Sequence, residues 1–184
     1  MTPHDASGVL PLGDPRLRDV STPVADVTDP AFVEAARRLQ AALEAFRAEH
    51  GFGRAIAAPQ IGIPKRFVSL DLGQGPFVII NPQITWASPE TFTMWDDCMC
   101  FPSLLVRVRR HRSISVRYAD EQDRPREWNR LDQATSELLQ HEIDHLDGVL
   151  AIDRALDPTA IISRAAFEAD PEAFRRQVDY VIGG

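Results

Sequence analysis

The spacing of hydrophobic residues predicts two long helices, one in each half of the chain. Between residues 29 and 51 apolar side chains recur every three or four positions, as on one face of an α-helix. Asp29 and Pro30 suit its first turn, and Gly51 suits its end. The second pattern runs from Asp132 to Leu146 and stops at Gly148. The residues on the first helical face are Phe32, Ala36, Leu39, Leu43 and Phe46.

Alternating and β-branched stretches between these helices predict strands. Residues 66–72 and 76–86 form two such stretches with a glycine-rich turn between them. Residues 92–101 are expected to be extended and to stop near Pro102. Residues 105–120 are rich enough in β-branched and alternating positions for two strands, which we expect to form a hairpin.

The remaining segments have weaker patterns. Four prolines before residue 29 predict a meandering N-terminal segment, and residues 51–64 read as a loop of small residues. A further helix is expected after Asp170 and Pro171, with Phe174, Val178 and Val181 on one face. Helices combined with antiparallel strands predict an α+β fold, and the length of 184 residues predicts one domain over residues 1–184.

Charge and composition narrow the function classes. The formal net charge of −7 argues against general affinity for nucleic acid or for an anionic membrane. No apolar run has the length of a membrane span, and the N-terminus lacks the pattern of a signal peptide. The two cysteines, in the sequence CMC, are too close for an unstrained disulfide and fit reduced thiols. We therefore expect a cytoplasmic protein.

One basic cluster, RVRRHR at residues 107–112, stands out against the acidic composition. We interpret it as a solvated strand face balanced by nearby acids. A weak contact with ribosomal RNA is the alternative. The aromatic residues expected between the basic residues of a single-strand binder are absent from the cluster.

The segment QHEIDHLDG, residues 140–148, contains the pattern H-E-x-x-H. His141 and His145 are four residues apart on the predicted helix, so both imidazoles can reach one metal ion. Glu142 is rotated away from His141 by roughly 100° and can reach a water on that ion. The alternative is a solvated helix face with two ordinary histidines, which the apolar residues around the pattern disfavour.

A catalytic metal site needs a third protein ligand and an open position. The spacing typical of one metalloprotease class would need histidine at position 151, which is Ala151. Glu168 and Glu172 lie downstream at weak spacing, whereas Cys98 and His111 lie upstream. Cys98 is the stronger candidate because it follows a predicted strand and precedes a loop that ends at proline. In isolation it would be a buried structural thiol.

Three stretches in order resemble the signature motifs of the peptide deformylase family. They are GRAIAAPQIG at residues 53–62, DDCMCFP at 96–102 and QHEIDHLDGVL at 140–150. The corresponding family patterns are G-x-G-x-A-A-x-Q, E-G-C-x-S and H-E-x-D-H. The opening LPLGDPRLR is similar to the family's N-terminal stretch, so the resemblance runs from about residue 9 to about residue 155.

This resemblance implies antiparallel strands around a central metal-binding helix and a hydrolase that removes the formyl group from N-formyl-methionyl peptides, releasing formate. The implied metal is Fe²⁺, for which Ni²⁺, Co²⁺ or Zn²⁺ substitutes. Glu142 would act as the base, and the Gln60 side chain and the Met99 backbone N–H would hold the oxyanion. The implied metal ligands are Cys98, His141 and His145.

The chain departs from the family pattern at four positions. Ala55 replaces the second glycine of the first motif. In the second motif Asp96 replaces glutamate, Asp97 replaces glycine and Cys100 replaces serine. None of these changes removes an implied ligand, the base or Gln60. They leave two alternatives open: a related metalloamidase for another formylated or acylated substrate, and a non-catalytic protein with a closed metal site that includes Cys100.

The substrate pocket is partly readable from the same stretches. We expect substrate contacts from Gly53, Ala55, Ile56, Asp97 and Leu138. With Ala134, Leu138 would line an apolar pocket for the methionine side chain, and core packing explains both residues equally well. Glu137 adds a carboxylate to Asp96 and Asp97, so we expect a preference for peptides with polar or basic groups near the formyl end.

Overall fold

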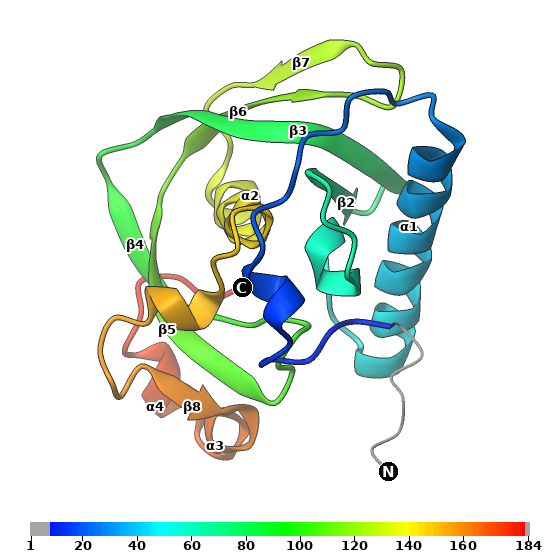
Figure 1. Ribbon diagram of the computed structural model, residues 1–184. Coiled ribbons are helices and arrows are strands. Elements are labelled where there is room, and N and C mark those ends of the chain that lie inside the picture. Colours follow the sequence, from blue (N-terminus) through cyan, green and yellow to red (C-terminus); the bar gives the residue numbers. More distant parts are fainter. Residues whose placement is uncertain (1–7, 183–184) are drawn as a thin grey trace.

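Two antiparallel sheets enclose a central helix (Figure 1). The computed structural model describes residues 8–182. The larger sheet has the strand order β1-β2-β3-β6-β7, and the smaller sheet has the order β4-β5-β8. The strands of the larger sheet are β1 (Ala55–Ala57), β2 (Phe67–Asp71), β3 (Pro76–Ala87), β6 (Ile114–Ala119) and β7 (Pro125–Trp128). Those of the smaller sheet are β4 (Thr91–Asp96), β5 (Leu104–His111) and β8 (Ile161–Ser163).

The central helix is α2 (Gln133–Leu146), seen nearly end-on in Figure 1. The side chain of Asp132 accepts a hydrogen bond from the backbone N–H of Thr135 and caps the first turn. Leu139, Ile143 and Leu146 pack with strand residues of the larger sheet in one apolar cluster. The α+β fold with a buried helix between antiparallel strands is therefore confirmed.

The first long helix is also confirmed, as α1 (Pro30–His50). Asp29 accepts a hydrogen bond from the Ala31 N–H at its start, and Gly51 ends it in the left-handed conformation at φ 77°. The predicted apolar face, which includes Leu39 and Phe46, is buried against Phe67 and Ile80 of the larger sheet. This packing fixes where the end of α1 lies relative to the larger sheet, and so where residues 51–64 start.

The predicted hairpin over residues 105–120 is wrong. β5 pairs with β4 and β8 in the smaller sheet, whereas β6 pairs with β3 and β7 in the larger one. The chain turns from one sheet into the other at Arg112 and Ser113, and β3 and β4 turn beside it at Ser88. The Ser88 N–H donates to the Ser113 carbonyl over 2.8 Å, and the Ser113 N–H donates to Ser88 Oγ over 3.1 Å. A two-stranded ribbon thus bends as a unit, and its two halves belong to different sheets.

The segment predicted as a loop over residues 51–64 contains β1 and a 3-10 turn, Ala58–Ile61. β1 pairs antiparallel with β2, so backbone hydrogen bonds rather than side-chain pattern define it. The sequence reading also missed β7, β8 and α3 (Arg164–Ala169). These elements are short and have too few residues for a periodic pattern.

The predicted C-terminal helix is too long. α4 (Pro171–Arg175) ends after five residues, so Val178 and Val181 do not continue its face. The following segment lies against the edge of β4, where Asp179 Oδ2 accepts hydrogen bonds from the N–H and hydroxyl of Thr93 over 2.9 and 2.8 Å. Pairing with the sheet edge replaces further helical turns.

The N-terminal segment fits the predicted meander over residues 8–28, with a single 3-10 turn at Pro15–Arg18. Residues 1–7 of that prediction lie outside the described residues. No helix between residues 8 and 182 is long and apolar enough to cross a membrane.

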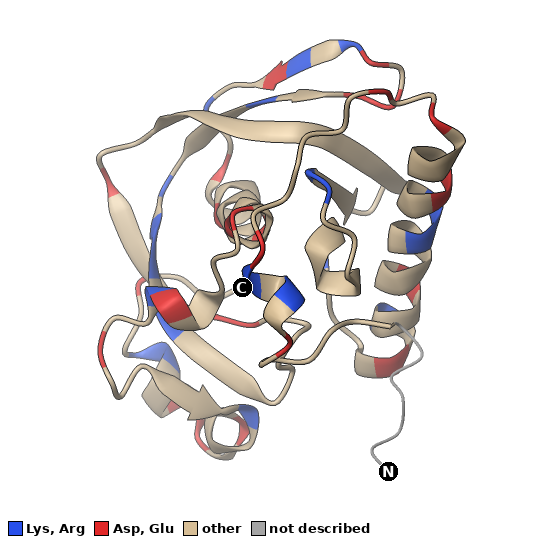
Figure 2. Ribbon diagram, in the orientation of Figure 1, with Lys and Arg blue, Asp and Glu red and all other residues tan. Residues whose placement is uncertain are grey.

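The basic cluster of residues 107–112 lies on β5 and at its end, and Figure 2 shows it as a basic stretch among otherwise interspersed charges. Arg107 binds Asp157 over 2.9 Å, and Arg110 is buried. Arg109 and Arg112 are exposed. The cluster is thus divided between internal ion pairs and the solvated strand face.

Candidate metal centre

The two histidines of α2 meet inside the protein. Both rings are buried, and Nε2 of His141 lies 3.1 Å from Nε2 of His145. Their spacing of one helical turn places them side by side, with ring centroids 4.9 Å apart. The alternative of a solvated helix face is excluded, because the two residues expose no more than 6% of their surface.

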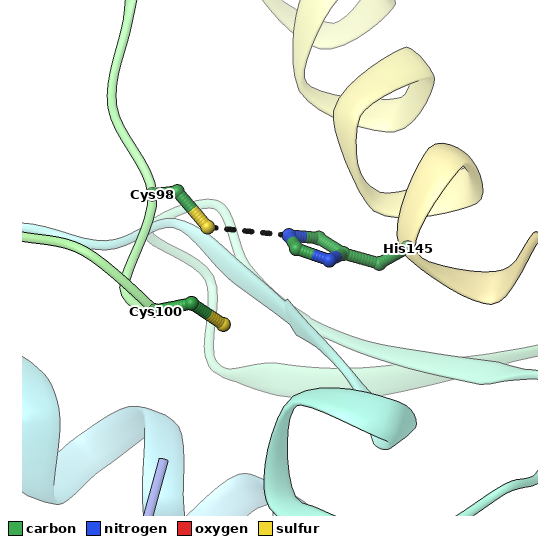
Figure 3. A group of neighbouring side chains, drawn as sticks. All are labelled: Cys98, Cys100 and His145. Carbon is green, nitrogen blue, oxygen red and sulfur yellow. Dashed lines mark hydrogen bonds between the residues drawn. The ribbon is translucent and has the colours of Figure 1, made fainter. Parts of the chain in front are cut away.

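Cys98 approaches the histidines from the turn that follows β4. The Phe101 N–H donates to the Cys98 carbonyl over 3.1 Å, which closes the turn. Cys98 Sγ lies 3.3 Å from Nε2 of His145, and Figure 3 shows the sulfur directed at that ring. The sulfur of Cys100, two residues later, lies on the same side of the turn as that of Cys98. The ligand atoms of Cys98, Cys100 and His145 all lie within 4.8 Å of one another.

These distances suit a tetrahedral metal ion. Bonds of about 2.0 Å to nitrogen and about 2.3 Å to sulfur imply separations of roughly 3.3 Å between two nitrogens and roughly 3.6 Å between nitrogen and sulfur. The observed 3.1 and 3.3 Å are close to these values. Two soft thiols and two imidazoles are also the donor types that bind transition metals. The residues therefore fit a divalent metal.

A buried ionic network holds the first histidine in place. Asp96 Oδ2 lies 3.0 Å from Nδ1 of His141, so the opposite ring nitrogen, Nε2, faces the centre. Arg110 donates to the same Asp96 oxygen over 2.9 Å and to Asp144 over 2.6 Å. Asp144 belongs to α2, so Arg110 ties β5 to the metal-binding helix.

The network also sets the charge of the site. Burial opposes ionisation of Asp96, but the adjacent His141 and Arg110 keep the pKa of Asp96 well below its usual range. Burial opposes the charged form of His141, but Asp96 raises the pKa of His141 to about 9. A metal would therefore compete with a proton for Nε2 of His141. Burial, assisted by the charge of His141, lowers the pKa of His145 and keeps it neutral and ready to bind.

Glu142 is a buried carboxyl beside this centre. Its Oε2 has no hydrogen-bond partner among the described residues, and 3% of the residue is exposed. Burial raises the pKa of Glu142 to about 7. A carboxyl with that pKa can both accept and release a proton near neutral pH.

Gln60 lies in the 3-10 turn after β1, on the side of the cysteines. Its Oε1 accepts a hydrogen bond from the Ala57 N–H over 2.7 Å, which orients the amide. Its Nε2 then points at Cys100 Sγ, 3.7 Å away, and at Cys98 Sγ, 3.9 Å away. The donor end of Gln60 is thus aimed at the metal centre.

A cavity of about 310 Å³ opens beside the centre. The sequence-predicted residues that line it are Gly53, Ala55, Gln60, Asp97, Cys98, Met99, Leu138, His141 and Glu142. Gly53 has φ 118°, a backbone conformation that favours glycine in this wall, and a Cβ there would also displace the end of the Met99 side chain, whose Cε would lie 2.5 Å away. Leu138 both lines the cavity and packs in the core.

Ile56 and Ala134 are not among the residues that line the cavity, and the substrate contacts expected from them stay predictions. Ile56 points to the opposite face of β1 from Ala55 and is buried in the core against α1. The carbonyl of Ala134 accepts a hydrogen bond from Arg54 over 3.1 Å.

The preference for peptides with polar or basic groups was predicted from three acidic residues, and the structure pairs each of them with arginine. Glu137 binds Arg54, Asp97 binds Arg164 over 3.1 Å, and Asp96 binds Arg110. The cavity wall therefore carries both signs of charge. Arg54 and Arg110 are functional neighbours that the sequence reading missed. Val106, Val108 and Arg110 are spaced two residues apart along β5 and therefore share its buried face. This spacing in the sequence indicates that Arg110 points inward.

The other ligand candidates lie elsewhere. Nδ1 of His111 lies 2.7 Å from the Ser88 carbonyl at the bend between the sheets. Glu168 and Glu172 are exposed on α3 and α4. Ala151 is a buried apolar residue. Cys98, rather than these residues, lies beside His145, which in turn contacts His141.

Comparison with known proteins agrees with this geometry. The family model described as polypeptide deformylase matches residues 6–160. A peptide deformylase of Thermotoga neapolitana is 40% identical over 144 residues, which is 78% of this chain and 83% of the relative. One of Synechocystis sp. is 37% identical over 155 residues, covering 82% of this chain and 79% of that one.

Solved structures show the same fold. The crystal structure of the Thermotoga maritima peptide deformylase superimposes with a TM-score of 0.72 at 35% identity, covering 81% of this chain and 97% of that chain. A Synechococcus elongatus peptide deformylase in complex with actinonin gives a TM-score of 0.75 at 29% identity, with 92% and 87% coverage. The chain therefore belongs to the peptide deformylase family, metal-dependent hydrolases that remove the formyl group from the N-termini of newly made polypeptides.

Proposed function

We propose that this chain hydrolyses N-formyl-methionyl peptides at the centre formed by Cys98, His141 and His145, with Fe²⁺ as the metal and Ni²⁺, Co²⁺ or Zn²⁺ as substitutes. The observation that carries the proposal is the pair of contacts that Nε2 of His145 makes with Cys98 Sγ and with Nε2 of His141, beside a cavity that Cys98 and His141 line. When bound there, the metal would polarise the formyl carbonyl and lower the pKa of a water.

Glu142 moves the protons. Its unpartnered carboxylate oxygen and its pKa of about 7 suit removal of a proton from the attacking water. The same carboxyl then gives a proton to the amine that leaves as formate departs. A low-dielectric setting supports both steps, because the side chain is surrounded by protein.

Gln60 holds the carbonyl oxygen as negative charge develops on it. Its amide is oriented by the Ala57 N–H, so donation to the substrate requires little reorganisation. The backbone N–H of Met99, between the two cysteines of the turn, is the second proposed donor. Gly53 and Ala55 leave space for the substrate backbone along the cavity wall.

Formate release from N-formyl-Met-Ala-Ser by protein prepared anaerobically with Fe²⁺ tests this function. We expect turnover in the wild type and a loss of about 10²- to 10⁴-fold in kcat in Glu142→Gln, with metal content unchanged. Exposed Glu44 on α1 supplies a matched control, because Glu44→Gln changes the same group far from the centre. Equal turnover of Glu142→Gln and wild type would contradict the proposed base. Metal bound at one equivalent without turnover in the wild type would favour the amidase alternative.

We also place the enzyme in the cytoplasm, where newly made chains are its substrates. The exposed Arg109 and Arg112 on the smaller sheet suit a weak contact with ribosomal RNA. Cosedimentation with ribosomes should fall as salt rises and should fall further in the double variant Arg109→Gln, Arg112→Gln. Salt-independent cosedimentation, or none, would remove this contact from the proposal.

A further inference from the structure

Cys100 is a second thiol at the centre, at the position where the family motif has serine. Its residue exposes 3% of its surface, and its Sγ is within 4.8 Å of both Cys98 Sγ and a ring nitrogen of His145. The Leu12 N–H donates to the Cys100 carbonyl over 2.8 Å, which fixes the backbone at this point. Figure 3 shows the Cys100 sulfur on the side of the turn that faces the imidazole.

A cysteine placed only for packing would direct its sulfur into the apolar cluster. Cys100 does contact that cluster, which includes Leu10 and Leu150. Its sulfur also accepts the side-chain amide of Gln60 over 3.7 Å, slightly closer than the same amide lies to Cys98 at 3.9 Å. The thiol therefore occupies the polar side of the site as well as the apolar one.

We propose that Cys100 is a fourth protein ligand, whose thiolate binds the metal in the resting enzyme at the position that the attacking water and the substrate need during turnover. This inference rests on the metal site of the proposed function. On binding, the Cys100 thiol releases its proton to solvent, and it regains a proton when the substrate displaces it. No oxidant or reductant is involved.

Two consequences follow from this ligand set. Two thiolates and two imidazoles form a soft tetrahedral set of the kind that zinc occupies in closed structural sites. The substrate must replace Cys100 in two contacts, the bond to the metal and the hydrogen bond from the amide of Gln60. The chain therefore holds its metal more tightly than a serine-containing site would, and it needs a higher substrate concentration to open.

The direct test is the absorption spectrum of the Co²⁺-loaded protein, because the thiolate-to-cobalt band in the near ultraviolet grows with the number of bound thiolates. We expect wild type to give about twice the band intensity of Cys100→Ser and of Cys100→Ala, in line with two thiolates against one. Cys98→Ser serves as the matched control, since it removes the other sulfur. Equal band intensity in wild type and both Cys100 variants would overturn the proposal.

Zinc affinity gives a second readout that does not depend on turnover. Competition with a chromophoric chelator should show Zn²⁺ bound at least tenfold more weakly by Cys100→Ser and Cys100→Ala than by wild type. Unchanged affinity in both variants would count against Cys100 as a ligand. Two variants are used because serine leaves a hydroxyl in a buried position, whereas alanine does not.

Formate release separates this inference from the proposed function. If Cys100→Ser deformylates with a lower KM than wild type, both stand. If it turns over like wild type and the cobalt bands are equal, the fourth ligand is overturned and the deformylase stands. If wild type shows the two-thiolate band but neither protein releases formate, Cys100 is a ligand and the proposed activity fails.

Discussion

Arg110 is buried, whereas the other arginines are exposed or half-buried. Its side chain is 3% exposed and binds carboxylates on two different elements, Asp96 at the end of β4 and Asp144 on α2. Asp96 in turn holds His141. A single guanidinium thus pairs with the buried Asp96 and the half-buried Asp144, and through Asp96 it helps to hold His141 in orientation.

Replacing Arg110 by methionine should lower the free energy of unfolding by about 3–5 kcal/mol, because the buried carboxylate of Asp96 loses its guanidinium partner. Arg37→Met is the control, since Arg37 pairs with Glu34 on the exposed face of α1. That exposed pair should contribute about 0–1 kcal/mol. Urea unfolding of the two variants measures both. Similar losses in the two variants would contradict the role given to Arg110.

Glu137 predicts a dependence of stability on pH. Burial raises its pKa from 4.5 to about 7, even though Arg54 attracts the charged form. Between these values the folded protein holds a proton that the unfolded chain releases, so rising pH favours unfolding. Below pH 4.5 the carboxyl is protonated in both states, and the folded protein has its full stability. This stability falls as pH rises above 4.5, and the loss is complete once pH has risen through about 7.

Relative to Glu137→Gln, the wild type should therefore lose up to about 3 kcal/mol of stability between pH 4.5 and pH 7. Urea unfolding of metal-free protein across this range measures the difference between the two curves. Parallel curves would show that Glu137 titrates at its ordinary value. Glu44 is exposed, so the difference between wild type and Glu44→Gln gives the baseline for a solvated carboxyl.

At this scale the sequence predicted the residues whose chemistry is local. His141, Glu142 and His145 lie within one helical turn or so, and Cys98 lies in a recognisable motif. The arginine partners of the acids were not predicted, because Arg54 and Glu137 are 83 positions apart and meet only in the folded chain.

Among the elements, the C-terminal end of α2 is held by close contacts with the N-terminal segment. Gly148 follows it at φ 71°, and a Cβ at that position would lie 2.4 Å from the carbonyl oxygen of Arg18. Nearby, the Ser21 N–H donates to the Leu146 carbonyl over 2.9 Å. The end of α2 is therefore packed against the backbone of the N-terminal segment.

Gly148→Ala should destabilise the protein by more than Gly51→Ala. Gly51 ends α1 at a similar φ of 77° but has nothing within 4 Å of an added Cβ. Each variant suffers about 1–2 kcal/mol of left-handed backbone strain, and Gly148→Ala adds about 1–3 kcal/mol from the close contact. Thermal and urea unfolding compare them. Equal destabilisation would mean that the Arg18 backbone gives way without cost.

The elements also show where periodicity is sufficient evidence. α1, α2, β2 and β3 were predicted because each repeats its pattern over several residues. β1 and β8 have three residues each, too few to repeat a pattern. The hairpin was wrong because alternation reports which face a residue takes, and it carries no information on which of two sheets a strand joins.

The whole molecule consists of two sheets that share one helix and one bent ribbon. β3 and β6 continue into β4 and β5 across the bend at Ser88 and Ser113. The larger sheet packs against α1 and α2, whereas the smaller sheet packs against the turn that holds Cys98 and Cys100 and against Leu10 and Leu17 of the N-terminal segment. The α+β class followed from the succession of patterns in the sequence, whereas the division into two sheets follows from tertiary contacts.

We predict that residues 1–184 unfold as one unit, which the tryptophans can test. Trp86 and Trp128 belong to the larger sheet and Trp95 to the smaller one. In Trp95→Phe the remaining tryptophans report the larger sheet. In the double variant Trp86→Phe, Trp128→Phe the remaining Trp95 reports the smaller sheet. The midpoint of each should coincide with that variant's own circular-dichroism midpoint. Separate midpoints would divide the chain into two units.

The side chains that meet at the centre come from distant parts of the chain: Cys98 and His145 are 47 positions apart, and Gln60 lies 38 positions before Cys98. A metal ion held by Cys98 and His145 would thus act as a removable cross-link that closes a long loop and restricts the unfolded chain, as a disulfide does. Deprived of metal, the same protein would be easier to unfold and to digest. The availability of metal in the cell would then set how long each molecule survives as well as how fast it works.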